Sequence, residues 1–413
     1  MRRTVALAAA VVAVALLAVP ASAGAATARA LASPNRFGFP PTVDLSYDAA
    51  LGEANRLTIA PAPNTTGEIE LRDPAAVVSP GPGCERLDDH VVVCSPRRLI
   101  GPTLAAPTGF DRVGAQLGDG ADEARVEGGV AAELRGEGGG DALRGSSGAD
   151  LIDGGTGRDT LDGGEGRDVF VEDDESAHDE IDGGLGGDRV DYTRRRRPVS
   201  VDLGRSRGAD GDRLLHVEEA YGGRAADRLF GGRGTNTLSG GGGRDLLSGG
   251  GGRDVLDVRE AAGAQQVDRA RCGPGSDVVT GVAAPDRLGR DCERALLQGV
   301  QSSGAFSVLV SQPLRAQSSG VVKVRLAVPP GAERFRGRAT IRFHGVLLGR
   351  PSPLVSLGPR GRVTARVSIV GPALSRLRAS RRLLVQLALN DAVLTTVLRA
   401  PLAPRSGTGG TPA

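Results

Sequence analysis

Residues 136–171 read GEGGGDALR, GSSGADLID, GGTGRDTLD and GGEGRDVFV, four nonapeptides that follow one another without a gap. A second run at 222–257 reads GGRAADRLF, GGRGTNTLS, GGGGRDLLS and GGGGRDVLD, and GGLGGDRVD lies between the two runs at 183–191. The nine units share the pattern G-G-x-G-x-D-x-U-x, in which U is apolar, and some units depart from it, at Glu137, Ser146, Ser147, Ala225 and Asn236. Glycines scattered by chance would not keep one phase of nine, so the pattern predicts a repeat architecture.

Each nonapeptide predicts one turn followed by one short strand. Glycines in the first half allow positive φ and close backbone approach. Two units then form a full coil, and successive coils stack about 4.8 Å apart with their strands in parallel register. Position 8 fills the narrow interior, which needs few aromatic side chains. The position-8 residues are Leu143, Ile152, Leu161, Phe170, Val190, Leu229, Leu238, Leu247 and Leu256.

Stacking also aligns the acidic position 6 on each side of the coil. Carboxylates about 5 Å apart repel by about 3 kcal/mol per pair at an effective dielectric constant of 20. A hard dication relieves this repulsion, and calcium accepts about six to eight oxygens in a flexible geometry, whereas magnesium demands a tighter octahedron. We therefore expect calcium ions along the ladder. Its members are Asp141, Asp150, Asp159, Asp168, Asp188, Asp227, Asn236, Asp245 and Asp254.

The pattern resembles the RTX, or haemolysin-type, calcium-binding nonapeptide repeats of secreted, actinobacterial-type proteins. The resemblance implies an all-β fold, a parallel β-roll (β-solenoid), in which carboxylate and backbone carbonyl oxygens of successive same-side turns hold each ion. Same-side pairing within the two runs implies about four ions. Asn236 is neutral, so its site is expected to be weaker. The glycines that the resemblance places at these sites are Gly154, Gly157, Gly163, Gly166, Gly231, Gly234, Gly240 and Gly249.

Other acidic and basic segments have simpler interpretations. One repeat aspartate alone would be an ordinary solvated turn residue. The position-9 acids, the segment 172–175 and the four arginines at 194–197 are expected to be exposed to solvent, although the arginines could also contact an anionic polymer.

The N-terminus is typical of a secretory signal. Arg2 and Arg3 precede an apolar run at 5–19, and Ala21-Ser22-Ala23 forms a small-residue cleavage site. The alternative is a membrane anchor, but the run is short for a span of about 20 residues. We expect a signal peptide at 1–23, a linker at 24–42 and an extracellular protein whose retention at the cell surface stays open.

Four cysteines fit an oxidising compartment. Four cysteines allow three connectivities. We expect the local pairs Cys84–Cys94 and Cys272–Cys292, because each pair brackets a turn-rich segment. Free buried thiols are the alternative, and the absence of a C-x-x-C motif disfavours zinc.

The regions that flank the repeats are also rich in strand patterns. Residues 43–135 are expected to form an irregular all-β N-terminal region leading into the solenoid, and 136–296 the roll with a disulfide-pinned end. Alternating apolar residues predict an Ig-like β-sandwich at 297–403, followed by a disordered tail at 404–413.

Charge separates the middle of the chain from its end. Residues 136–257 hold 26 acids and 16 bases, whereas 301–413 hold 2 acids and 17 bases. The basic domain could bind an anionic cell-wall polymer, dock on the acidic roll or simply stay solvated. Nucleic acid is not expected, because aromatic residues do not interleave the basic ones. The oligomeric state stays open.

No H-E-x-x-H, G-x-S-x-G or Walker A motif occurs in the chain, and its four histidines lie in unrelated contexts. We therefore expect a calcium-binding protein with a structural or cell-surface role and no enzymatic activity. The alternatives are an extracellular enzyme or toxin that uses the repeats for secretion and folding, and an adhesin that uses the basic domain.

Overall fold

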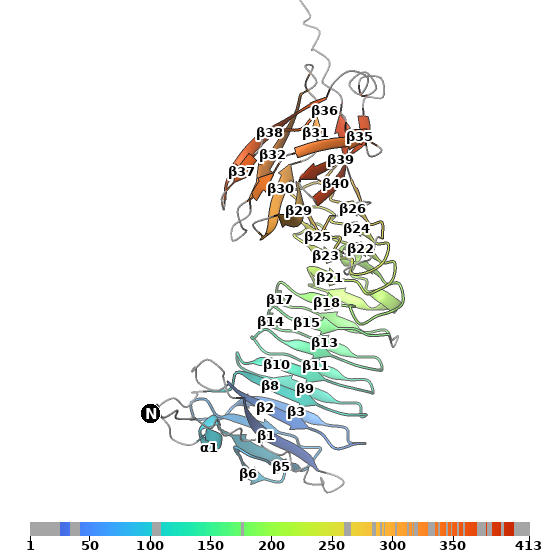
Figure 1. The fold of residues 1–413 in the computed structure, drawn as a ribbon. Coiled ribbons are helices and arrows are strands. Elements are labelled where there is room, and N and C mark those ends of the chain that lie inside the picture. The colour runs from blue at the N-terminus through green and yellow to red at the C-terminus, as the bar shows by residue number, and fades with distance from the viewer. Residues whose placement is uncertain are drawn as a thin grey trace, which may run out of the picture.

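The computed structural model describes residues 25–33, 42–100, 109–174, 177–259 and 266–282, and most of 286–399. The expected signal peptide and C-terminal tail lie outside the described residues. The fold is an all-β parallel roll, with further sheets beyond its C-terminal end (Figure 1). No helix in the described part of the chain is both long and apolar enough to cross a membrane.

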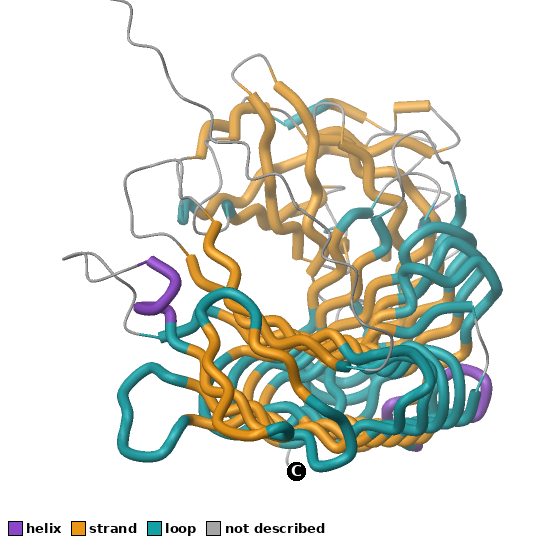
Figure 2. Tube along the Cα trace, turned by 90° about the horizontal axis from the view of Figure 1, so that it is seen from below, coloured by secondary structure: helices purple, strands orange, loops and turns teal. Residues whose placement is uncertain are grey.

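The roll has two faces, each a parallel sheet to which every coil adds one strand (Figure 2). The first roll sheet stacks β8 (Arg112–Gln116), β10 (Ala131–Arg135), β12 (Leu151–Asp153), β15 (Val169–Val171), β18 (Arg189–Asp191), β21 (Glu219–Tyr221), β23 (Thr237–Ser239), β25 (Val255–Asp257) and β27 (Val278–Thr280).

The second roll sheet has two blocks. Its first block stacks β3 (Arg56–Pro61), β9 (Glu123–Val126), β11 (Ala142–Arg144), β13 (Thr160–Asp162), β16 (Glu180–Asp182) and β20 (Arg213–Leu215). Its second block stacks β19 (Ser200–Asp202), β22 (Arg228–Phe230), β24 (Leu246–Ser248), β26 (Arg269–Arg271) and β28 (Arg287–Leu288).

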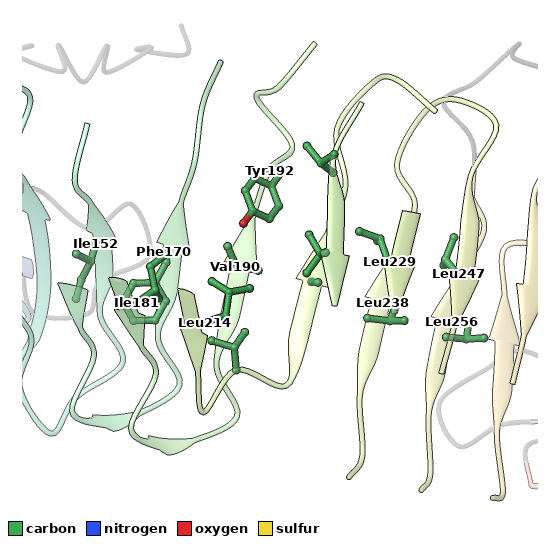
Figure 3. Packing of buried hydrophobic residues seen from close by; sticks show 14 of the residues in the cluster. Ile152, Phe170, Ile181, Val190, Tyr192, Leu214, Leu229, Leu238, Leu247 and Leu256 are labelled. Atoms are coloured by element: carbon green, nitrogen blue, oxygen red, sulfur yellow. The ribbon is translucent and has the colours of Figure 1, made fainter. Parts of the chain in front are cut away.

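Position 8 of each repeat forms the core, as predicted. The nine position-8 side chains are no more than 1 % exposed. Parallel register places Leu143 against Leu161 and Leu229 against Leu247, so each apolar side chain lies on its equivalent one coil away (Figure 3). Since positions 7 and 9 point outward, one apolar residue per strand is enough to build a continuous interior.

The turns need glycine because successive coils come close. Gly155 and Gly157 have φ values of +89° and +121°. A Cβ on either residue would overlap a carbonyl oxygen of the preceding coil, that of Glu137 or of Gly139. Glycine is therefore fixed at these positions by backbone conformation and by stacking distance together.

The N-terminal region is more regular than the sequence indicates. Parallel stacking is already present in β8, β9 and β10, before residue 136. The pattern is hidden there because other residues replace its markers, for example Ala132 at position 6 of its unit. Part of the expected linker is also ordered, since residues 26–33 form β1 (Ala26–Ser33), which pairs with β2 (Thr42–Asp48).

Short antiparallel strands cover this end of the roll. They are β4 (Ile69–Arg72), β6 (Cys84–Asp88) and β7 (Val91–Cys94), with β5 (Val78–Pro80) beside β1 and the helix α1 (Pro96–Ile100) after β7. Cys84 and Cys94 lie directly opposite each other in β6 and β7 and form the predicted disulfide, with Cα atoms 3.9 Å apart.

At the other end, the predicted disulfide joins Cys272 to Cys292 across the last coil. The strand β29 (Arg294–Gln301) crosses the expected domain boundary at 297. It pairs in parallel with β27 of the roll and antiparallel with β30 (Gly304–Ser311), so the first roll sheet continues into the C-terminal region.

The C-terminal region contains two larger sheets. One continues from β30 through β32 (Val321–Ala327) and β38 (Arg362–Ile369) to β36 (Gly349–Arg350). The other contains β31 (Leu314–Arg315), β40 (Ala392–Arg399), β39 (Arg382–Leu389), β34 (Ala339–Phe343) and β35 (Val346–Leu347). A small pair, β33 (Phe335–Gly337) and β37 (Val355–Leu357), forms a separate two-stranded sheet that contacts β30 and β38. The Ig-like sandwich arrangement stays a prediction.

Candidate metal centre

The position-6 side chains lie just before the strands and form two buried ladders, one beside each roll sheet. The nine predicted ladder residues are at most 5 % exposed. The first ladder brings together Asp150, Asp168 and Asp188, and further along the roll Asn236 and Asp254. The second ladder brings together Asp141 with Asp159, and Asp227 with Asp245.

One hydrogen bond repeats along both ladders. Oδ1 of the position-6 aspartate accepts from the backbone N–H of position 6 in the preceding coil, and Asn236 is an exception. Examples are Asp141 N to Asp159 Oδ1 at 2.8 Å and Asp150 N to Asp168 Oδ1 at 2.9 Å. The bond holds each carboxyl group in one orientation and leaves Oδ2 for another partner.

The second oxygen has no hydrogen-bond partner at many of these positions. Among the predicted residues, this is true of the buried Oδ2 atoms of Asp141, Asp159, Asp168, Asp188 and Asp254. A buried carboxylate oxygen without a partner is costly. These atoms are therefore the ones that a bound cation would satisfy.

Two ladder aspartates and the one asparagine differ. Oδ2 of Asp227 accepts from Gly223 N at 2.7 Å, and Oδ2 of Asp150 accepts from Ser146 N. Asn236 accepts from Gly232 N at 2.8 Å and donates to Glu218 O at 3.1 Å. The neutral amide thus finds protein partners for both ends, and the weaker site there stays a prediction.

Carbonyl oxygens converge on the same places. A Cβ placed on Gly222 would lie 2.5 Å from Asp227 Oδ2 and 2.6 Å from the carbonyl oxygen of Gly240, one coil further on. At Gly249, the corresponding atoms are Asp254 Oδ2 at 2.5 Å and Cys272 O at 2.7 Å. Gly222 and Gly249 at position 1 therefore each leave room for two oxygens from successive coils.

The expected carbonyl donors divide by position. The carbonyl oxygens of Gly154, Gly163, Gly240 and Gly249 lie beside the ladder residue of the preceding coil. Those of Gly166 and Gly234, at position 4, point toward Gly186 and Gly252 of the next coil, and that of Gly231 lies near Gly250. Gly157 has the position-4 conformation, with a φ of +121°.

This donor set fits a hard cation such as calcium, which accepts carboxylate and carbonyl oxygens. Within the residues that the structure describes, no group of three or more His, Cys, Asp or Glu side chains could hold a metal. Backbone carbonyls would therefore supply much of each coordination shell, as they do in sites built from turns.

Burial changes the acidity of the ladders. Removal from water raises the pKa of Asp141, Asp159 and Asp254 to about 6 and that of Asp168 to about 7. Hydrogen bonds from the backbone act in the opposite direction on each of them. The ladders therefore take up protons readily when no cation balances their charge.

The ladders are longer than the sequence analysis predicted. Asp122, Asp179 and Asp212 extend the second ladder through the same Oδ1 hydrogen bond, and Glu218 occupies one step of the first. The further members, toward the C-terminal end, are Asp268, Asp277 and Asp286. In these additional units the sequence keeps only one feature of the repeat, an acid two residues before an apolar residue, as in Asp179 and Ile181.

The repeat is interrupted after β15 and again after β18, where side chains replace turn glycines. Glu172 and Tyr192 stand at position 1, because their N–H groups donate to Asp191 O and Tyr221 O as the position-1 glycines do elsewhere. The Tyr192 hydroxyl donates to Asp212 Oδ2 at 3.3 Å. The side chains thus fill the space that oxygen atoms line in the other coils.

Arg195 completes this interruption. Its side chain is 4 % exposed, forms ion pairs with Glu172 at 3.3 Å and with Asp210, and lies 5.0 Å from the centre of the Tyr192 ring. The expectation that 172–175 and 194–197 are exposed is therefore wrong for Glu172 and Arg195. The helical turns η1 (Leu203–Arg205) and η2 (Ala209–Gly211) follow in the same insertion.

The fold and the two ladders define a calcium-binding β-roll. The family model of the RTX calcium-binding nonapeptide repeat matches residues 135–170 and 221–256, in four copies. The chain therefore carries RTX calcium-binding repeats. No curated protein matches it.

Proposed function

We propose that this chain is a secreted protein whose two ladders bind calcium and thereby fold and stiffen the roll outside the cell, in a structural or cell-surface role. The observation that carries the proposal is the set of buried, unpartnered Oδ2 atoms beside carbonyl oxygens of the next coil. The proposed role is one of binding and includes no catalysis.

The physical reasoning concerns the free energy of the folded roll. Without a cation, each ladder buries carboxylates whose charge or unpaired oxygen costs stability. A cation that binds only the folded ladders contributes its binding free energy to folding. Extracellular modules typically bind calcium with a dissociation constant of about 10⁻⁴ to 10⁻³ M.

The test is circular dichroism of the whole chain in a chelator, in millimolar calcium and in millimolar magnesium. We expect a gain of β-structure and a higher melting temperature in calcium only. Equal folding in the chelator and in calcium would overturn the proposal.

A matched pair of substitutions tests the ladder itself. Asp254 is 1 % exposed and its Oδ2 has no hydrogen-bond partner. Asp257, three residues later in the same unit, lies outside the ladder, accepts a hydrogen bond from Arg259 N at 3.1 Å and forms a 4.0 Å ion pair with the Arg259 side chain. We expect Asp254→Asn to raise the calcium concentration at the folding midpoint by about threefold to tenfold, because a carboxylate ligand is lost. Asp257→Asn should leave the midpoint unchanged, and equal shifts in both variants would exclude Asp254 as a ligand.

The cell-surface part of the proposal is supported by the basic charge of residues 301–413. It predicts that the protein stays with washed cells at low ionic strength and is released by salt. If all of the protein were recovered in the medium at low salt, the cell-surface role would be excluded. The protein would then be a freely secreted structural protein.

A further inference from the structure

The outer face of the second block of the second roll sheet is unusually basic. We call this surface, formed by β19, β22, β24, β26 and β28, the basic face. Arg228, Arg269, Arg271 and Arg287 all point outward and are exposed. None of the four forms an ion pair with a described carboxylate. Asp202, at the edge strand β19, is the one acid at the outward positions of these strands, and it is paired with Arg205 at 2.8 Å.

Register brings two of these arginines together. Arg269 lies directly beside Arg287, and Arg228 and Arg269 are both neighbours of Leu246. Like charges on adjacent strands destabilise a sheet. The Arg269–Arg287 pair costs stability and has no acid beside it to offset the repulsion. Features that cost stability without a structural gain are typical of functional sites.

The first block of the same sheet shows how the roll otherwise arranges its charges. There Arg144 lies beside Asp162 in the register and pairs with it at 3.3 Å, and Arg213 lies beside Glu180 and pairs with it. Arg125 pairs with Glu127 at 3.3 Å. The four arginines of the second block thus differ from these three in having no ion-pair partner among the described carboxylates.

The acids of the second block are buried instead. Asp227, Asp245, Asp268 and Asp286 belong to the second ladder and are at most 2 % exposed. The exposed Asp291, after β28, accepts a hydrogen bond from Gly273 N and forms no ion pair with the four arginines. The outer surface of this block thus presents cations while its acids face the ladder.

We propose that the basic face binds a linear polyanionic polysaccharide, whose chain lies along the stack of strands. The strands place cations at intervals of about 5 Å or small multiples of it on a flat, rigid surface. Such a row complements a polymer that carries anionic groups at regular intervals. The half-buried Phe230 and Leu246, between the arginines, offer apolar surface to sugar rings.

The same features disfavour nucleic acid. Single strands are held largely by aromatic stacking, and Phe230 is the one aromatic side chain on these strands. A flat sheet also presents no element that enters a groove of a duplex. The face is distinct from residues 297–403, which the sequence analysis associated with anionic polymers.

The test compares binding of the whole chain to dextran sulfate and to neutral dextran in calcium. The variant Arg228→Gln/Arg269→Gln/Arg271→Gln/Arg287→Gln removes the four unpaired charges. The matched control, Arg112→Gln/Arg125→Gln/Arg144→Gln/Arg213→Gln, removes four arginines that pair with carboxylates elsewhere on the roll. Circular dichroism of both variants in calcium verifies that the roll is folded.

We expect the chain to bind dextran sulfate but not dextran, and the affinity to fall steeply with salt. The first variant should lose about tenfold or more in affinity and show a shallower salt dependence, as expected when cationic contacts to a polyanion are removed. The control should change little. Equal losses in the two variants, or tighter binding of double-stranded DNA than of dextran sulfate, would overturn the proposal.

Discussion

At the scale of single residues, the ladder aspartates combine two roles that usually belong to different side chains. Oδ1 belongs to the architecture, because it joins one coil to the next through a backbone N–H. Oδ2 is the oxygen that we propose faces the cation. Asn236 differs, because its Oδ1 accepts from Gly232 N of its own unit and its amide group, not Oδ1, joins the coils by donating to Glu218 O.

The first prediction at this scale concerns pH. In the folded roll without calcium, burial raises the pKa of Asp141 and Asp159 to about 6 and that of Asp168 to about 7, from 3.8. The folded state therefore holds protons that the unfolded state has released, and stability falls as pH rises from about 4 to about 7.

In a chelator, we thus expect the melting temperature to be highest near pH 4 and to decline toward pH 7. In calcium, the trend should reverse across the same range, because a cation requires the deprotonated carboxylates. Thermal melts from pH 4 to 8 in both conditions check this. A melting temperature that rises with pH in the chelator would contradict the conclusion that burial raises the pKa of the ladder aspartates.

At the scale of the element, the unit is a turn whose glycines are not interchangeable. Gly157 and Gly234 both stand at position 4. Gly157 has a φ of +121°, and a Cβ there would overlap the Gly139 carbonyl oxygen of the preceding coil. At Gly234, a Cβ would meet no atom within 4 Å.

We therefore expect Gly157→Ala to destabilise the roll by about 1–3 kcal/mol or more, because the backbone is strained and the turns must separate. Gly234→Ala should change stability by less than about 1 kcal/mol. Calcium-saturated thermal melts compare the two variants. Similar effects of both would mean that the turns adapt, and that stacking distance does not select glycine.

The sequence analysis predicted the strands and ladder residues where the nonapeptide repeat is regular. It did not predict them where other residues replace the repeat pattern. Phase alone located the position-8 core, from Leu143 to Leu256, and the ladder residues before each strand. It missed Asp122, whose unit keeps Gly118 and Gly120 but begins with Leu117, and Asp179, whose turn has no glycine, although stacking on a regular neighbour keeps both in register. Periodicity also carries no information on residues that break it, so the burial of Arg195 could not be predicted.

At the scale of the whole molecule, the roll is one continuous stack that is closed at both ends by disulfides and further strands. Its first sheet runs without interruption from β8 to β27, whereas its second sheet is divided at the insertion between β20 and β19. The two blocks differ in surface charge as well as in position, so the molecule presents two different flanks along one axis.

The buried Arg195 network lies at this division, next to ladder residues that elsewhere lack a partner. A guanidinium there is an internal counter-ion for Asp210 and donates a hydrogen bond to Glu172, whose pKa burial raises to about 9. We therefore expect the middle coils to stay folded in a chelator while the two glycine-rich arrays loosen. In hydrogen exchange, the amides of Glu172, Tyr192 and Arg195, which donate to backbone carbonyls, should remain protected without calcium.

Arg195→Gln should abolish that protection, because breaking a buried ion pair costs about 3–5 kcal/mol. The neighbouring Arg194→Gln removes an exposed arginine paired with Asp153 and should not. Loss of protection in both variants, or in neither, would contradict the inference that Arg195 keeps the middle coils folded without calcium. Because the coils around Arg195 need no calcium to balance their charge, the arrays at 136–171 and 222–257 can each gain or lose ions separately. When calcium falls, we therefore expect the two arrays to loosen independently while the coils between them stay rigid.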